Sequence, residues 1–125
     1  MDEDLTKYDY MLKDYFDTKK KINCVNDKIL NYKKLKEDDK ACEEVLSAQK
    51  DLIEIYISKI KNYVFIDTIL KTELEYANKI LTDKYLKNKS WQAVALNNYI
   101  SVRQCFNIKN RVLEKIKEEY LKLNI

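Results

Sequence analysis

Five residues between positions 103 and 111 have side chains that can read the edges of DNA bases: Arg103, Gln104, Asn107, Asn110 and Arg111. With about 100° of rotation per helical residue, the first arginine and both asparagines share one face, flanked by the glutamine and the second arginine. These residue types present paired donors and acceptors that match guanine and adenine in the major groove. The face has no acidic residue before Glu114. The alternative interpretation is an ordinary helix face that contacts only water.

Two short helices joined by a tight turn would position this face. Ser90 is placed to cap a helix over residues 91–97, and Ser101 to cap a final helix from residue 102 to about 123. Asn97-Asn98 ends the first helix because asparagine tolerates the left-handed conformation. This outline predicts a helix-turn-helix whose recognition helix enters the major groove. Its inward-facing residues are expected to be Trp91, Val94, Ala95, Ile100, Cys105, Ile108, Val112, Leu113 and Ile116.

Basic residues concentrate around the same segment. Residues 79–111 contain seven Lys or Arg and a single acid, Asp83, whereas residues 1–78 carry a net charge of −3. A basic block within a nearly neutral chain is typical of nucleic-acid contact, and a solvated lysine-rich surface is the alternative. Phosphate contacts position a protein on DNA. We expect such contacts from Lys87, Lys89, Ser90 and Lys109.

The composition restricts both the fold and the chemistry. The chain has 125 residues and contains no Gly, Pro or His. Tight β-turns depend on Gly, and most loops use Pro, so we expect an all-α fold. Gly-rich phosphate loops are excluded, and the usual general base and metal ligand, histidine, is missing. We therefore expect no catalytic residue, no cofactor and no metal site, with the three cysteines reduced and buried.

An apolar pattern with alternating steps of four and three runs through the first third of the chain: Tyr8, Met11, Tyr15, Thr18, Ile22, Val25, Ile29 and Tyr32. It predicts a helix from about Asp4 to Leu35 with a narrow coiled-coil seam. A turn over residues 36–40 leads into a second helix with a broad apolar face from Leu52 to Leu70. The two helices are expected to form an antiparallel hairpin. The seam either packs within this hairpin or dimerises the protein.

Thr68 or Thr72 is expected to mark the turn that follows this hairpin. A third, shorter apolar stripe comes next, formed by Leu74, Ala77, Ile80, Leu81 and Tyr85. We therefore divide the chain into a helical hairpin for oligomerisation or partner binding, residues 1–72, and a DNA-binding module, residues 73–125.

The stretch from Tyr85 to Ser101, followed by Cys105, Val112-Leu113 and Ile116, resembles the fourth region of sigma factors. In that region a short polar link, a helix ending in an Ile-Ala pair and an Ile-Ser cap lead into the recognition helix. A small chain with this module after a helical N-terminal part is similar to RinA/ArpU-type phage transcriptional activators, which control late or packaging genes. The resemblance covers residues 74–120. It departs from the family pattern in the turn, where Asn98-Tyr99 replaces the usual glycine.

Together these observations predict a cytoplasmic, sequence-specific DNA-binding transcriptional regulator, encoded by a phage or prophage. Its expected partners are double-stranded DNA, a second copy of the chain paired through the N-terminal helices, and RNA polymerase. No apolar run is long enough to predict a membrane span. The alternative function is a helical adaptor that binds a partner protein through its coiled-coil seam without contacting DNA.

Overall fold

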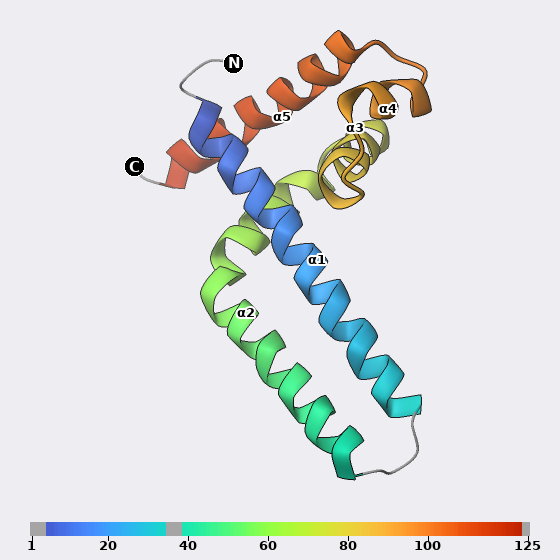
Figure 1. The fold of residues 1–125 in the computed structure, drawn as a ribbon. Coiled ribbons are helices and arrows are strands. Elements are labelled where there is room, and N and C mark those ends of the chain that lie inside the picture. Colours follow the sequence, from blue (N-terminus) through green and yellow to red (C-terminus); the bar gives the residue numbers. More distant parts are fainter. Residues whose placement is uncertain (1–4, 35–38, 124–125) are drawn as a thin grey trace.

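The regular structure of the described residues is helical throughout, which confirms the all-α prediction. The computed structural model describes residues 5–34 and 39–123. It contains α1 (Thr6–Lys34), α2 (Asp39–Lys71), α3 (Glu75–Leu81), a π-helical turn η2 (Thr82–Leu86), α4 (Trp91–Asn97) and α5 (Val102–Leu123). Figure 1 shows α1 and α2 as a long antiparallel pair, with α5 crossing the amino-terminal end of α1. In the described part of the chain, no helix is both long and apolar enough to cross a membrane.

The observed helix bounds lie close to the predicted ones. The last helix was expected over residues 102–123 and spans Val102–Leu123, and the first was expected over 4–35 and spans Thr6–Lys34. Most of the turn predicted over residues 36–40 lies outside the described residues. The second helix ends at Lys71, and Thr72, one of the two predicted turn residues, donates its hydroxyl to the carbonyl of Ile69 at 2.7 Å.

The apolar seam of α1 is covered within the chain. Tyr8, Tyr15, Ile22 and Val25 are buried, and Ile29 is half-buried. Helix α1 packs mainly against α2, and also against η2 and α5. Of the two alternatives for this seam, packing within the chain is therefore the one observed as far as Ile29. The side chain of Tyr32, the last member of the seam, lies outside the described residues.

The main hydrophobic core joins the two halves of the chain. Its buried side chains come from α1, α2, α3, η2 and α5, and include Leu12, Ile66, Leu81, Tyr85 and Leu113. The domain boundary was predicted between residues 72 and 73. The segments before and after this boundary contribute to the same core. Because burial of apolar surface is the main favourable term in folding, the hairpin and the C-terminal helices stabilise each other.

A smaller core lies between α3, α4 and α5. Ile80, Val94, Ala95 and Cys105 are buried in it, and Trp91, Ile100, Val102 and Ile108 pack against it. Apart from Ile80 and Val102, these are the residues expected to face inward around the turn. Ala95 is small enough to let α4 and α5 approach closely. Of the other cysteines, Cys24 is exposed, contrary to expectation, and the side chain of Cys42 lies outside the described residues.

The third helix begins one residue later than its apolar stripe suggested. Leu74 precedes α3 as its N-cap residue and is 57% exposed, so it is not part of the buried stripe. The helix then widens into η2, where the amide of Lys87 donates to the carbonyl of Thr82 at 3.0 Å. This widened turn buries the side chain of Asp83. Asp83 lies beneath the polar link that leads to α4.

We predict that Leu12→Ala lowers the stability of the whole chain by about 2–5 kcal/mol, because it opens a cavity in the shared core. Urea unfolding should be followed by far-ultraviolet circular dichroism and by the fluorescence of Trp91, the only tryptophan. Both curves should shift together. Leu30→Ala is the matched control, since Leu30 lies on the same helix and is 56% exposed. Separate transitions for the two probes would contradict a shared core.

Candidate nucleic-acid interface

Helix α4 and the turn after it are fixed by local hydrogen bonds. The hydroxyl of Ser90 accepts from the amide of Ala93 at 3.2 Å, so the predicted N-cap of α4 is confirmed. At the other end, the side-chain amide of Asn98 donates to the carbonyl of Val94 at 2.7 Å and to the buried carboxylate of Asp83 at 3.2 Å. The amide of Ile100 then donates to the carbonyl of Ala95 at 3.1 Å. These bonds hold the start of α5 against the end of α4.

The left-handed residue of this turn is Tyr99, with φ of 57°, whereas Asn98 has φ of −106°. Asparagine was expected in the left-handed position. Asn98 instead uses its side chain to close the helix end, and the next residue adopts the positive φ. The side chain of Tyr99 is almost fully exposed. A β-carbon in this region is unfavourable. The surrounding hydrogen bonds and the packing of the partly buried Ile100 against the smaller core hold the conformation.

Helix α5 begins with a reciprocal cap between Ser101 and Gln104. The hydroxyl of Ser101 accepts from the amide of Gln104 at 3.1 Å, and the amide of Ser101 donates to Oε1 of Gln104 at 2.8 Å. This is a capping box, which satisfies two amides that would otherwise lack partners. The predicted cap by Ser101 is confirmed. The side-chain oxygen Oε1 of Gln104 accepts a hydrogen bond in this cap, so only the side-chain nitrogen Nε2 is left to contact a base.

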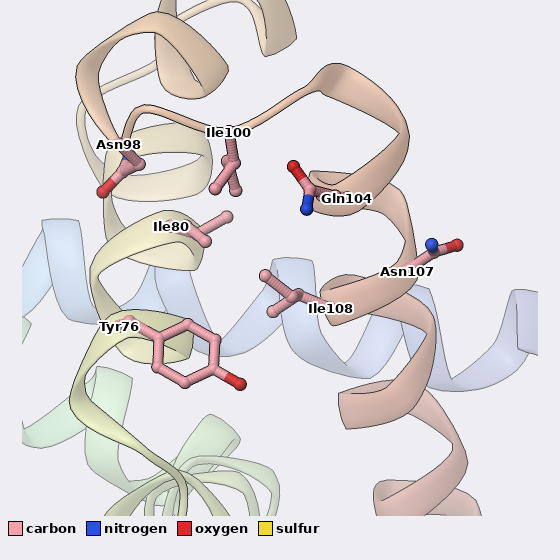
Figure 2. A pocket seen from close by; sticks show the side chains of 7 residues that line it. All are labelled: Tyr76, Ile80, Asn98, Ile100, Gln104, Asn107 and Ile108. Atoms are coloured by element: carbon pink, nitrogen blue, oxygen red, sulfur yellow. The ribbon is translucent and has the colours of Figure 1, made fainter.

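The central face of the predicted contact surface points away from the protein. Arg103 and Asn107 are exposed, and Asn110 is half-buried. Figure 2 shows Asn107 directed outward from α5, while Gln104 and Ile108 point back toward α3 and the turn. Arg103 makes no ion pair with any residue that the structure describes. The first two turns of α5 therefore present one guanidinium and one carboxamide to solvent.

Lys109 does not belong to this exposed surface, which corrects the prediction that it contacts phosphate. It is buried, and its ammonium lies 3.4 Å from Oδ1 of Asp9 on α1 and 5.7 Å from the ring centre of Trp91. The hydroxyl of Tyr85 also donates to Oδ1 of Asp9, at 3.4 Å. Burial, and then the nearby carboxylate, raise the pKa of Tyr85 and keep it neutral. Lys109 therefore joins α5 to α1.

Arg111 is held at the edge of the predicted surface. Its Nη2 lies 3.5 Å from Oε2 of Glu73, and its Nη1 donates to the hydroxyl of Tyr76 at 3.2 Å. That hydrogen bond raises the pKa of the Arg111 guanidinium. Glu73 is well buried and also binds Lys115 at 3.4 Å. About half of the Arg111 side chain is exposed, so this side chain can reach a phosphate only by leaving or sharing its two partners.

The link before α4 keeps the other predicted phosphate contacts at the surface. Lys87 and Ser90 are exposed and Lys89 is half-buried. The ammonium of Lys87 lies 3.6 Å from Oδ1 of Asp83, and the amide of Lys89 donates to the carbonyl of Asp83 at 3.1 Å. Asp83 was not among the residues predicted to organise this site. Its position as the only acid in the basic block, four residues before Lys87, is the feature that could have indicated this role.

The cations of residues 79–111 therefore differ in whether an acidic side chain lies beside them. Three of the seven cations face acidic partners: Lys87, Lys109 and Arg111. The other four make no ion pair with a described residue: Lys79, Lys84, Lys89 and Arg103. One of them, Lys84, lies 5.2 Å from the ring centre of Trp91, against which Phe106 also packs. The unpaired positive charge lies on α3, on η2, in the link before α4 and in the first turn of α5.

A cavity of about 410 Å³ lies beside the first turns of α5, lined by Tyr76, Ile80, Asn98, Ile100, Gln104, Asn107 and Ile108. Figure 2 shows three isoleucines, Ile80, Ile100 and Ile108, directed toward one another across it. Its lining is largely apolar, and the described residues contain no group of three or more His, Cys, Asp or Glu that could hold a metal ion. The cavity lies between α3, the turn and α5, and two residues of the predicted contact surface, Gln104 and Asn107, contribute to its lining.

No model of a known protein family, no curated protein and no solved structure matched this chain.

We predict that Asp9→Asn lowers the free energy of unfolding by about 3 kcal/mol, because it leaves the charge of Lys109 buried without a counter-ion. Lys109→Met should cost less, since Asp9 keeps Lys13 at 3.0 Å and Tyr85 as partners. Chemical unfolding at neutral pH measures both effects. Lys28→Met, at an exposed position of α1, is the control and should change stability by within about 0.5 kcal/mol. Equal stability of Asp9→Asn and the wild type would contradict the structural role of this pair.

Proposed function

We propose that the chain is a sequence-specific DNA-binding transcriptional regulator, with α4 and α5 as its helix-turn-helix and α5 as the recognition helix. The observation that supports this best is the outward face at the start of α5, where Arg103 and Asn107 are exposed on a helix held by a capping box. Recognition helices approach base edges with their amino-terminal residues. Rigid positioning of these side chains favours specific hydrogen bonds over loose electrostatic contact.

The contact set that we propose is smaller than the sequence suggested. Arg103 and Asn107 would contact bases, with Asn110 and the amide nitrogen of Gln104 at the edges of the contact. Lys87, Lys89 and Ser90, from the link before α4, would contact phosphates, because they lie at the surface near the start of this helix. Arg111 would contribute only by sharing its guanidinium with Glu73. Lys109 is outside the set because it is buried.

The wider biological assignment is also part of this proposal. The resemblance to sigma-factor region 4 and to RinA/ArpU-type activators supports a cytoplasmic, phage or prophage regulator. A single module of this size reads a short site, and useful specificity in a genome then needs a second DNA contact. A second copy of the chain or RNA polymerase would supply it.

A helical adaptor without DNA binding is the competing function, and the exposed apolar side chains of α2 favour it. Salt dependence distinguishes the two. Binding to a random duplex should weaken steeply between low and moderate salt if Lys and Arg displace counterions from phosphates. An adaptor should bind the duplex at neither salt concentration. Fluorescence anisotropy with a labelled duplex gives this answer without knowledge of the target sequence.

We predict that Arg103→Ala weakens binding to a duplex selected by the protein from a random pool by about 1–3 kcal/mol, if the guanidinium pairs with a guanine. Binding to an unselected duplex should change little, and helicity and melting temperature should be retained because Arg103 is exposed. Equal losses on both duplexes would make Arg103 a phosphate contact. No loss on either would mean that α5 does not enter the groove.

Lys89→Ala provides the contrasting case. It should weaken the selected and the unselected duplex alike, and reduce the slope of log affinity against log salt by about one phosphate contact. Lys28→Ala is the matched control, because it removes an exposed lysine of α1, away from the link and from α5. A Lys28 variant that loses as much affinity as the Lys89 variant would show general electrostatic attraction and contradict a defined interface.

A further inference from the structure

The outer face of α2 carries a row of exposed aliphatic side chains, which we call the α2 seam: Leu46, Ile53, Ile57, Ile60 and Val64. Their exposed fractions are 65%, 57%, 77%, 38% and 51% respectively. This face is distinct from the one that packs on α1, where Ala48 and Ile66 are buried. Scattered exposed apolar residues are ordinary, but a continuous row marks an interaction surface.

The α2 seam has the spacing of a coiled coil. From Leu46 the steps are seven, four, three and four residues, and the one missing position is occupied by Lys50. This assigns Ile57 and Val64 to heptad position a, and Leu46, Ile53 and Ile60 to position d. At about 1.5 Å per residue, the seam extends for roughly 27 Å. A strict a/d row is narrow, and it fits one further helix.

We propose that the α2 seam pairs antiparallel with the α2 seam of a second copy of this chain. In the register that we assign, Ile57 lies opposite Ile60 of the second copy, and Ile53 lies opposite Val64. By the two-fold symmetry each contact occurs twice, which gives four consecutive apolar layers. The pairing concerns a surface that DNA binding does not use, so the two proposals can fail independently.

Charge selects the antiparallel direction. In a parallel, in-register pair, each residue faces its own counterpart, so Lys50 would lie against Lys50 within the apolar core. A buried pair of like charges is strongly unfavourable. In the antiparallel register, Lys50 lies opposite Asp67 instead, so no like charges meet. The Asp67 carboxylate also accepts from the hydroxyl of Tyr15 at 2.7 Å and pairs with Lys71 at 3.0 Å within its own chain.

Charge also selects the register. Glu54 and Lys61 are exposed and occupy position e, beside the apolar layers. Antiparallel pairing brings position e of one helix against position e of the other, so Glu54 meets Lys61 of the second copy twice about the symmetry axis. Sliding the helices by one heptad would bring Glu54 against Glu54 and place Lys50 opposite Ile60. The sequence of α2 therefore favours one alignment over its neighbour.

The first test is the effect of a charge in the central layer. Sedimentation equilibrium should show a dimer of the wild type, and Ile57→Asp should raise its dissociation constant by about 100-fold or more, because an unpaired carboxylate would be buried. Circular dichroism should show the same helicity, since Ile57 is 77% exposed within one chain. Leu121→Asp, at an exposed leucine of α5, is the control and should remain dimeric. A wild type that is monomeric at high micromolar concentration would overturn the proposal and leave the seam to a different helical partner.

A charge exchange tests direction and register. Glu54→Lys alone should weaken the dimer at least about tenfold, because it places two Lys–Lys contacts beside the core. Adding Lys61→Glu should restore the affinity, since each copy again presents opposite charges to the other. A parallel pair would place Glu54 beside Gln49 and Lys61 beside Tyr56, so Glu54→Lys would create no Lys–Lys contact and would leave the affinity nearly unchanged. An unchanged affinity of the single variant, or failure of the double variant to recover, would overturn the antiparallel register. The response of DNA affinity to Arg103→Ala would be unaffected by either result.

Discussion

The carboxylate of Asp9 holds the two halves of this protein in a fixed relation. It lies on α1, is buried, and accepts from Lys109 on α5, Lys13 on its own helix and Tyr85 on η2. Replacing water around a charge is costly, so a buried carboxylate tolerates only a geometry that keeps its partners in place. Through Lys109, this contact ties α5 to α1.

Helix α5 contributes to both hydrophobic cores, because different turns of the helix bury their side chains in different places. Its later turns supply Val112, Leu113 and Ile116 to the main core, while Cys105 belongs to the smaller core beside the turn. Over the first turns of α5, the face that points away from both cores is polar. A helix held at both cores presents that face with little freedom, which lowers the entropic cost of specific binding.

The proposed DNA-contact surface and the α2 seam lie on different helices. The proposed DNA contact would use the start of α5 and the link before α4, whereas the proposed pairing would use the outer face of α2 (Figure 1). Because the main core joins α2 to α5, a dimer formed through α2 would hold two recognition helices at a defined separation. The coiled-coil pattern that the sequence analysis assigned to α1 is used to close the monomer, and the α2 seam is the row left uncovered.

The sequence by itself determined the all-α fold and the bounds of most helices, although not the start of α3 or the π-helical turn that follows it. The absence of Gly and Pro excluded β-structure, and Ser90 and Ser101 marked two helix starts because capping is a local interaction. Only the tertiary structure decided which polar side chains stay at the surface. Lys109 and Arg111 look like Arg103 in the sequence, but Asp9 and Glu73, which lie 100 and 38 residues earlier, bind them. Such long-range pairings depend on how whole helices pack, and the spacing of residues along the chain does not predict them.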